Sequence, residues 1–250
     1  MTDPSSASPT PPTKKRRPVV WIVVAVVVAL VLVVGGPFLY INVIKEDAPP
    51  PLALPTTTAP AADGQSSTTA APSGDLTDID GSWTVGEGTQ VGYRVEEVLF
   101  GQSTEGVGRT GEVEGTLTVD GTTVTGVDLT VDMTTVTSDS TQRDGQFSGR
   151  IMETSTHPTA TFALTEPIEL GTVPTDGETV TVTATGELTL KGTTKPVTVE
   201  LQAQRSGSSF NVVGAIPITF ADYGINNPSG GPAQVGDTGT LELLVVFTPA

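Results

Sequence analysis

The sequence contains no cysteine and a single histidine, His157. Without cysteine, the chain has no disulfide, no thiol nucleophile, no thiolate metal ligand and no lipid-acceptor thiol. A zinc site needs three or four nitrogen, sulfur or oxygen ligands, so this composition argues against one. A Ser-His-Asp triad would have to use His157, which precedes a proline and is not accompanied by a Gly-x-Ser-x-Gly motif. We therefore predict no catalytic residue, no metal and no cofactor.

Basic residues are also scarce. The chain has 12 Lys and Arg against 28 Asp and Glu, which gives a formal net charge of −16. Part of the positive charge is concentrated in Lys14–Arg17, so the remainder of the chain is acidic. Nucleic-acid phosphates require Lys and Arg, and an acidic body does not lie flat on anionic lipid. We predict no nucleic-acid partner.

One long apolar run follows this basic cluster. The segment from Val19 to Ile41 has almost no polar group, and at about 1.5 Å per residue it crosses a hydrocarbon core of roughly 30 Å. Signal peptides have shorter apolar regions of about 7–15 residues. We predict a retained transmembrane signal-anchor helix over 19–44, with cleavage as the alternative. The positive-inside rule places a disordered tail, 1–18, in the cytoplasm and the C-terminal domain outside the cell membrane.

Residues 45–78 are rich in proline, alanine, threonine and serine. Such a segment cannot bury enough apolar surface to offset the entropy lost on ordering. We predict a disordered, partly polyproline linker that lets the folded domain stand off from the membrane.

Over residues 79–250 the pattern changes, and apolar residues recur with a period of two, as in half-buried β-strands. The clearest runs are Val127–Met133, Val180–Leu190, Val197–Ala203, Gly214–Phe220 and Leu241–Phe247. Asp120-Gly121 and Gly192 mark two hairpin turns. About eight antiparallel strands with one buried face either close as a barrel or fold as a sandwich.

The segment Ser138–Pro158 breaks this alternation. Asp139 or Ser140 is suited to cap a helix, and Phe147 and Ile151 are four residues apart on one helical face. We predict one short helix across one end of the sheet. Inward positions of the strands are mostly small or aliphatic, and in an eight-stranded barrel that favours holding a small ligand over filling the interior.

Three stretches resemble the YceI-like domain family. They are the hairpin Gly186–Val197, the middle segment with Arg143-Asp144, His157-Pro158 and Phe162, and the final segment with Asp222–Ile225 and Val235–Asp237. The chain is thus identified as a membrane-anchored bacterial member. The resemblance implies an all-β, eight-stranded antiparallel lipocalin-like barrel, whose apolar tunnel holds a long isoprenoid-type chain, in an exported protein without catalytic machinery. The family often has a histidine in its first long strand, whereas Tyr93–Glu97 has none.

We predict that the tunnel binds an apolar lipid, isoprenoid or quinone-like. The candidate ligand-binding residues are Tyr93, Met133, Phe147, Ile151, Phe162, Leu190, Phe220 and Tyr223. The sequence leaves open whether these groups line a cavity or fill a core, and whether Tyr223 closes the tunnel or only packs.

The polar candidates also have two interpretations each. Arg143-Asp144 either holds a ligand headgroup or forms an ion pair at the helix start. Glu96 and Glu97 point to opposite faces of a strand, which allows one of them to face inward. Asp128 and Asp132 share a polar strand face, and an exterior position is favoured over a glycosidase-type carboxylate pair.

These inferences predict a membrane-tethered, extracytoplasmic lipid-binding module that sequesters or transfers an isoprenoid-type ligand and is not an enzyme. The alternatives are a non-catalytic β-sandwich scaffold or adhesion domain of the cell envelope, or an envelope hydrolase. A wholly apolar interior argues against the hydrolase, and a filled core without a cavity supports the scaffold.

Overall fold

A computed structural model describes residues 17–30, 48–55, 79–230 and 233–250. The chain divides into two units, Met1–Asp47 and Ala48–Ala250. In the first unit, helix α1 (Arg17–Leu30) covers the first part of the predicted anchor 19–44, and the rest of that prediction lies outside the described residues, as does most of the predicted tail. Within the parts of the chain that the structure describes, none of the helices is both long enough and apolar enough to cross a membrane.

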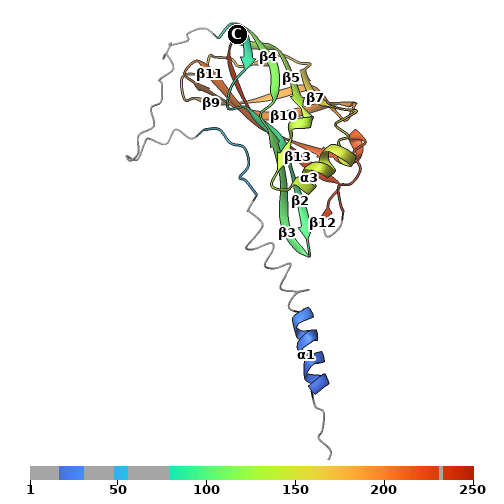
Figure 1. The fold of residues 1–250 in the computed structure, drawn as a ribbon. Helices are drawn as coiled ribbons and strands as arrows, with labels where there is room; N and C mark the ends of the chain where they lie inside the picture. Colours follow the sequence, from blue (N-terminus) through green and yellow to red (C-terminus); the bar gives the residue numbers. More distant parts are fainter. Residues whose placement is uncertain (1–16, 31–47, 56–78, 231–232) are drawn as a thin grey trace, which may run out of the picture. The chain divides into compact units, whose positions relative to one another are not determined.

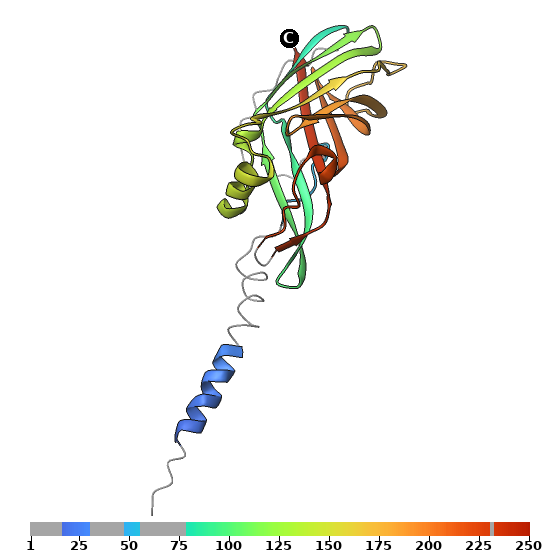
Figure 2. The same cartoon turned by 90° about the vertical axis from the view of Figure 1, so that its right-hand side faces the viewer.

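The second unit is a single antiparallel sheet that closes on itself (Figures 1 and 2). Its strands are β1 (Gly81–Val85), β2 (Gln90–Leu99), β3 (Gln102–Thr110), β4 (Val113–Asp120), β5 (Thr123–Asp132), β6 (Thr137–Ser138), β7 (Thr159–Leu164), β8 (Ile168–Glu169), β9 (Thr179–Leu190), β10 (Thr193–Ser206), β11 (Ser209–Thr219), β12 (Ala233–Val235) and β13 (Thr238–Pro249). Its helical segments are η3 (Met133–Thr135), α3 (Thr141–Gln146), η4 (Phe147–Ile151) and η5 (Phe220–Tyr223).

Strand β1 closes the barrel. The ring runs β1-β4-β5-β7-β9-β10-β11-β13 and returns to β1, because Trp83 pairs with Leu117 of β4 on one side and with Pro249 of β13 on the other. With both edges of β1 paired, the sheet is one closed layer around one core. The prediction of an eight-stranded antiparallel barrel is therefore confirmed, and the sandwich alternative is wrong.

The ring of strands is closed at the end where β1 lies, and it opens toward the opposite end of the barrel. Strand β13 pairs with β1 through its last residues and with β2 through Thr240–Leu244. Strand β3 continues from β2 and next pairs with β6 rather than with β4. The segments 133–158, 220–230 and 233–237 lie at this open end, with α3 and β12 visible there in Figures 1 and 2.

The alternating sequence pattern sets the two faces of the wall. On β9, Ala184, Leu188 and Leu190 are buried while their sequence neighbours Thr183 and Glu187 are exposed. The β9–β10 hairpin is confirmed: Leu190 pairs with Thr193 across a two-residue turn. Lys191 and Gly192 both have positive φ, 48° and 73°, as a tight hairpin turn that matches strand twist requires.

The predicted short helix is also present, and it lies at the open end. The Ser140 hydroxyl accepts a hydrogen bond from the Arg143 N–H at 3.4 Å and so caps α3. The helix then widens into the single π-turn η4. Phe147, the first residue of η4, lies in the core, where it is 7 % exposed.

The predicted linker 45–78 is described only over 48–55, and this stretch differs from the prediction. Residues 48–55 belong to the barrel unit, and the carbonyl oxygens of Pro49 and Pro50 accept hydrogen bonds from strands β2 and β3. Leu52 and Leu54 are half-buried, so the segment has apolar groups that its proline-rich composition obscured. The remainder of the predicted linker lies outside the described residues.

Candidate functional site: the barrel interior and its open end

The inner wall of the barrel is apolar and retains accessible surface. Leu129, Val182, Leu201 and Leu243 point inward by strand register and pack against the buried core, yet each is only half-buried. In a barrel that is filled by its own side chains, inward residues are close-packed and lose their accessible surface. The middle of the barrel is therefore lined rather than fully filled.

The closed end, by contrast, is filled. The rings of Trp83 and Phe210 meet edge to face, with centroids 5.1 Å apart. The indole N–H of Trp83 donates to the carbonyl of Ile79 at 3.0 Å, and Ile79 is 1 % exposed. Phe247 is buried beside them. This aromatic cluster stops the interior at one end, so access to the apolar wall comes from the other.

Inward glycines let large side chains lie flat along the wall. A Cβ added to Gly108 would come within 2.5 Å of the Tyr93 ring, and one added to Gly186 would come within 2.5 Å of the Phe162 ring. Both glycines therefore occupy positions where only a hydrogen atom fits. Side chains that lie against a wall leave the barrel axis less obstructed than side chains that stand upright across it.

A polar cluster lies at the open end. Glu97 of β2 is the inward member of the Glu96-Glu97 pair and is buried. One nitrogen of the Arg143 guanidinium, Nη2, is 2.9 Å from its Oε1, and Nη1 contacts the Asp139 carboxylate. Burial by itself lowers the pKa of Arg143, but the charges of Glu97 and Asp139 outweigh that effect and raise it. The guanidinium is therefore fixed in its charged form between two carboxylates.

Tyr93 borders this polar cluster. Its ring stacks on Phe147 with centroids 5.2 Å apart and planes at 14°. Burial raises the pKa of its phenol, the charge of Arg143 opposes the rise, and the charges of Asp144 and Asp139 reinforce it. The phenol is thus a neutral group throughout the physiological range, able both to donate and to accept one hydrogen bond.

Arg143 and Asp144 do not pair with each other. Asp144 Oδ1 instead accepts hydrogen bonds from the backbone N–H and the hydroxyl of Ser138, at 2.9 and 2.6 Å. Of the two interpretations of Arg143-Asp144, an ion pair at the helix start is present, but the acidic partners of Arg143 are Asp139 and Glu97 rather than Asp144. Asp144 fixes the helix to β6, and Arg143 fixes it to β2.

Arg150 joins the two segments at the open end, and sequence reasoning missed it. Its Nη2 donates to the carbonyl oxygens of Pro228 and Ser229, at 2.8 and 3.1 Å. The only sequence signal was a basic residue at the end of the predicted helix, which is equally typical of an ordinary helix C-terminus. The pairing needed the fold, since the partners lie about eighty positions away along the chain.

The eight predicted ligand-binding residues are distributed along the interior, mostly toward the open end. Tyr93 and Phe147 are stacked, and Phe220 lies beside Val95 over Gly239. Phe162 covers Gly186 within the barrel. The others pack on the same core from the open end: Met133 and Ile151 half-buried, Leu190 and Tyr223 buried. Whether they contact a ligand stays a prediction.

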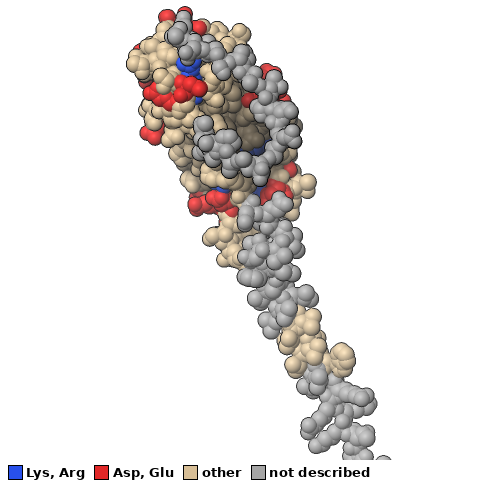
Figure 3. Space-filling model, turned by 90° about the vertical axis from the view of Figure 1, so that its left-hand side faces the viewer, with Lys and Arg blue, Asp and Glu red and all other residues tan. Residues whose placement is uncertain are grey.

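The other polar candidates occupy structural positions. Asp128 lies exposed on the outer face of β5, and Asp132 accepts from the backbone and hydroxyl of Thr134 at the start of η3. The ring of His157 lies against Gly192 in the β9–β10 turn. Among the described residues, no group of three His, Asp or Glu side chains is placed to hold a metal ion. On the face shown in Figure 3, acidic side chains outnumber basic ones.

The sequence of this chain matches a family model described as the YceI-like domain over residues 83–247. The chain belongs to the YceI-like domain family. The match begins at Trp83 in the closing strand β1 and ends at Phe247 in β13, so it encompasses the whole ring. No curated protein matches the chain in sequence.

Solved structures agree with this assignment at the level of the fold. A polyisoprenoid binding domain from Saccharophagus degradans, described as implicated in plant cell wall breakdown, is similar with a TM-score of 0.56 and 18 % identity, over 68 % of this chain and 98 % of that one. Burkholderia cenocepacia BcnA is similar with a TM-score of 0.50 and 20 % identity, over 63 % of this chain and 95 % of that one. At these identities the likeness establishes the YceI-like fold.

Proposed function

We propose that this YceI-like barrel binds one long isoprenoid-type lipid, with the apolar chain along the inner wall and the headgroup at the open end. The observation that carries the proposal is the half-buried inner wall between a filled closed end and a polar open end. The similar Saccharophagus degradans domain is named for polyisoprenoid binding, which supports the same ligand class.

The apolar wall supplies the driving force in this proposal. Burial of each chain methylene contributes about 0.8 kcal/mol, so ten or more buried methylenes outweigh a modest cost of ordering the lipid. Dispersion and burial do not distinguish one apolar chain from another of the same length. Selectivity among headgroups therefore has to come from the polar cluster around Arg143.

That cluster favours an uncharged headgroup. The Arg143 guanidinium is already paired with Glu97 and Asp139, and Asp144 lies close enough to act on the Tyr93 phenol. One positive charge among three carboxylates leaves this cluster negative, which disfavours a phosphate or diphosphate beside it. A quinone or alcohol suits the site better, because the neutral Tyr93 hydroxyl is able to donate to its oxygen.

The proposed setting is extracytoplasmic. The apolar run 19–44 behind Lys14–Arg17 supports a single-pass anchor with the N-terminus in the cytoplasm and the barrel outside. A tethered barrel of this kind sequesters an isoprenoid lipid or transfers it at the membrane surface. We propose no catalytic role, and the one inward carboxylate singled out above, Glu97, is held in an ion pair rather than poised for proton transfer.

The test compares three lipids with the same isoprenoid chain, ending in a quinone, an alcohol or a diphosphate. Each is presented to the Ala48–Ala250 unit, and bound lipid is quantified by mass spectrometry after gel filtration. We expect the quinone and the alcohol to bind at least about tenfold more tightly than the diphosphate. The double variant E97Q/D139N should narrow that difference, while the exterior control D128N should not.

Two results would contradict parts of the proposal separately. Equal or tighter binding of the diphosphate would overturn the headgroup preference and leave the lipid-binding function standing. Failure of all three lipids to bind a folded barrel would overturn the function itself.

A further inference from the structure

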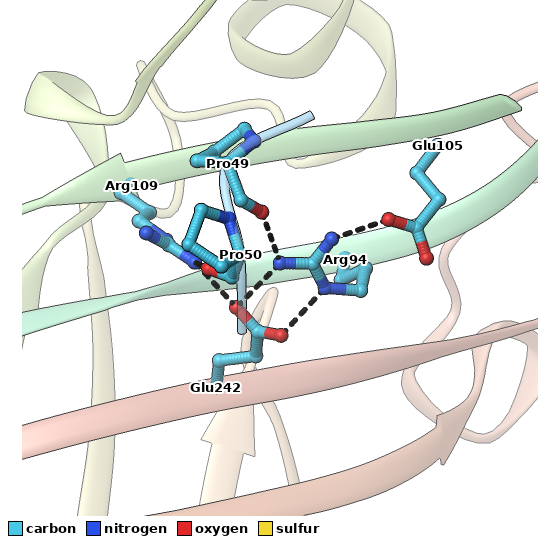
Figure 4. A network of polar contacts seen from close by, with 6 residues as sticks. All are labelled: Pro49, Pro50, Arg94, Glu105, Arg109 and Glu242. Carbon is cyan, nitrogen blue, oxygen red and sulfur yellow. Dashed lines mark hydrogen bonds and ion pairs between the residues drawn. The ribbon is translucent and has the colours of Figure 1, made fainter. Parts of the chain in front are cut away.

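The segment 48–55, which we call the strap, lies on the outer wall of the barrel. The Arg94 Nη2 group donates to the Pro49 carbonyl at 2.8 Å, and the Arg109 Nη2 group donates to the Pro50 carbonyl at 2.5 Å (Figure 4). Strap and barrel form one unit, although 56–78 separate them in sequence. The contact is therefore a tertiary one, between segments that are far apart in the sequence.

The two arginines are held in position by acidic residues of the same wall. Glu242 accepts from Arg94 Nε at 2.6 Å and from Arg109 Nη2 at 3.0 Å, and Glu105 accepts from Arg94 Nη1 at 2.5 Å (Figure 4). Glu242 stands between the inward Leu241 and Leu243, so it points outward, yet only 6 % of it is exposed. Burial of a carboxylate on an outer wall requires a cover, and the strap lies there.

Burial alternates along the strap. Leu52 and Leu54 are half-buried, whereas Pro51, Ala53 and Pro55 are exposed. Alternation with a period of two is typical of an extended chain with one apolar side. Proline also suits the geometry, because it restricts the chain to extended conformations before docking and leaves the carbonyl oxygens as the available acceptors.

We propose that the outer wall of β2, β3 and β13 is a built docking site for the strap, and that docking and release of the strap set the length of the tether. At no more than about 3.6 Å per residue, the chain from Ile44 to Ala48 spans roughly 14 Å. With the strap released, the chain from Ile44 to Ile79 extends up to about 126 Å on the same scale. The docking site stands on the contacts above, and the tether length rests on the proposed membrane anchor.

Docking of this kind is reversible. The strap is held by two hydrogen bonds and two half-buried leucines, which is a small interface. The strap therefore exchanges between docked and released forms rather than being a permanent part of the wall.

The charges at the site predict how docking responds to salt. The strap itself carries no charged side chain, and Arg94 and Arg109 are balanced by Glu105 and Glu242. Screening acts on net charge, and here the net charge on both sides is zero. Docking should therefore be almost insensitive to ionic strength, unlike attraction of a basic tail to an acidic body.

The first experiment measures strap docking in the full chain. Because the chain has no native cysteine, the variant A53C/S103C accepts two spin labels only, at two exposed positions, and their distance distribution is measured by pulsed electron resonance. We expect one narrow distance from the docked form to dominate, with the same population at low and high salt. Adding L52A/L54A to the strap should reduce the docked fraction at least about tenfold, while the apolar control L52I/L54I should retain it.

A second variant tests the barrel side. R109Q replaces the guanidinium that donates to the Pro50 carbonyl with a shorter, uncharged amide. It should broaden the distribution as L52A/L54A does, with circular dichroism showing whether the barrel remains folded. Because L52A/L54A leaves the barrel sequence intact, unfolding of R109Q would not prevent the test. A broad distribution in the parent chain, or no change in L52A/L54A, would overturn the docking site.

The tether length is measured in lipid nanodiscs. A donor dye at S103C transfers energy to acceptor lipids, and L52A/L54A should lower the transfer because the released tether is longer. Unchanged transfer in a variant whose strap is released would overturn the tether-length proposal. A chain that fails to enter nanodiscs would instead overturn the anchor under "Proposed function", with the spin-label result on docking unaffected.

Discussion

Gly108→Ala places a methyl group where the Tyr93 ring lies. The added Cβ would be 2.5 Å from Cε1, 2.8 Å from Cζ and 2.9 Å from the hydroxyl oxygen of Tyr93. The ring is also stacked on Phe147. It therefore has to leave its stacked position or push the strand apart.

The cost follows from these contacts. Overpacking of a core costs about 1–3 kcal/mol, and loss of an aromatic pair costs about 0.5–1.5 kcal/mol. Alanine has fewer unfolded conformations than glycine, so replacing a strand glycine by alanine stabilises the fold by about 0.5–1 kcal/mol and offsets part of this cost. We expect a net loss of about 2 kcal/mol in the free energy of unfolding.

The assay is urea unfolding of the Ala48–Ala250 unit, followed by fluorescence of the buried Trp83. Gly126→Ala is the matched control, because its added Cβ would meet nothing closer than 3.9 Å, and it should show only the gain of about 0.5–1 kcal/mol that alanine brings through the unfolded chain. In a Tyr93→Ala background, Gly108→Ala should cost much less, since the ring it strikes is gone.

The reasoning fails if Gly108→Ala is as stable as Gly126→Ala. It also fails if the cost is the same with and without the Tyr93 ring, since the loss would then come from the backbone and not from the cross-strand contact.

Two further predictions concern the wall and the open end. Gly186→Ala should lower stability by about 1–3 kcal/mol, because its Cβ would be 2.5 Å from both the Phe162 ring and the Ala163 carbonyl oxygen; a stability equal to or above that of Gly126→Ala in the same urea assay would contradict this. Glu153→Gln should reduce stability at neutral pH, because the hydrogen bond from Lys191 lowers the pKa of Glu153. A lowered folded-state pKa stabilises the fold above the unfolded-state pKa, so the difference between parent and variant should shrink as pH falls below the ordinary glutamate pKa and vanish once Glu153 is protonated in the folded state; a difference that does not shrink with falling pH would refute the assignment.

Local patterns predicted the strands and turns well. The alternation in Val180–Leu190 and Val197–Ala203 indicates which side chains face inward, and Gly192 marks the turn between them, because both signals depend on neighbours in sequence. Closure of the barrel could not be predicted from such local patterns. Nothing local to Trp83 shows that its strand pairs with β4 on one side and with β13 on the other.

In the candidate site, too, local patterns predicted some features, while contacts between residues distant in sequence were missed. The pair Glu96-Glu97 was expected to place one carboxylate inward, and the structure selects Glu97. The partner of Arg143 was missed, because Glu97 lies 46 positions away while Asp144 is its neighbour in sequence. The strap was assigned to a disordered linker from its composition alone, although its sequence shows Leu52 and Leu54 spaced two residues apart between proline and alanine.

The measurement that tests the central claim most directly is native mass spectrometry of the Ala48–Ala250 unit, exported by a bacterial host and purified without detergent, with solvent extraction of the same sample. The account predicts a stoichiometric adduct that extracts as an uncharged long-chain isoprenoid or quinone. A bare protein that also fails to take up added isoprenoid lipids would contradict it, and would favour a barrel that acts through its outer surface.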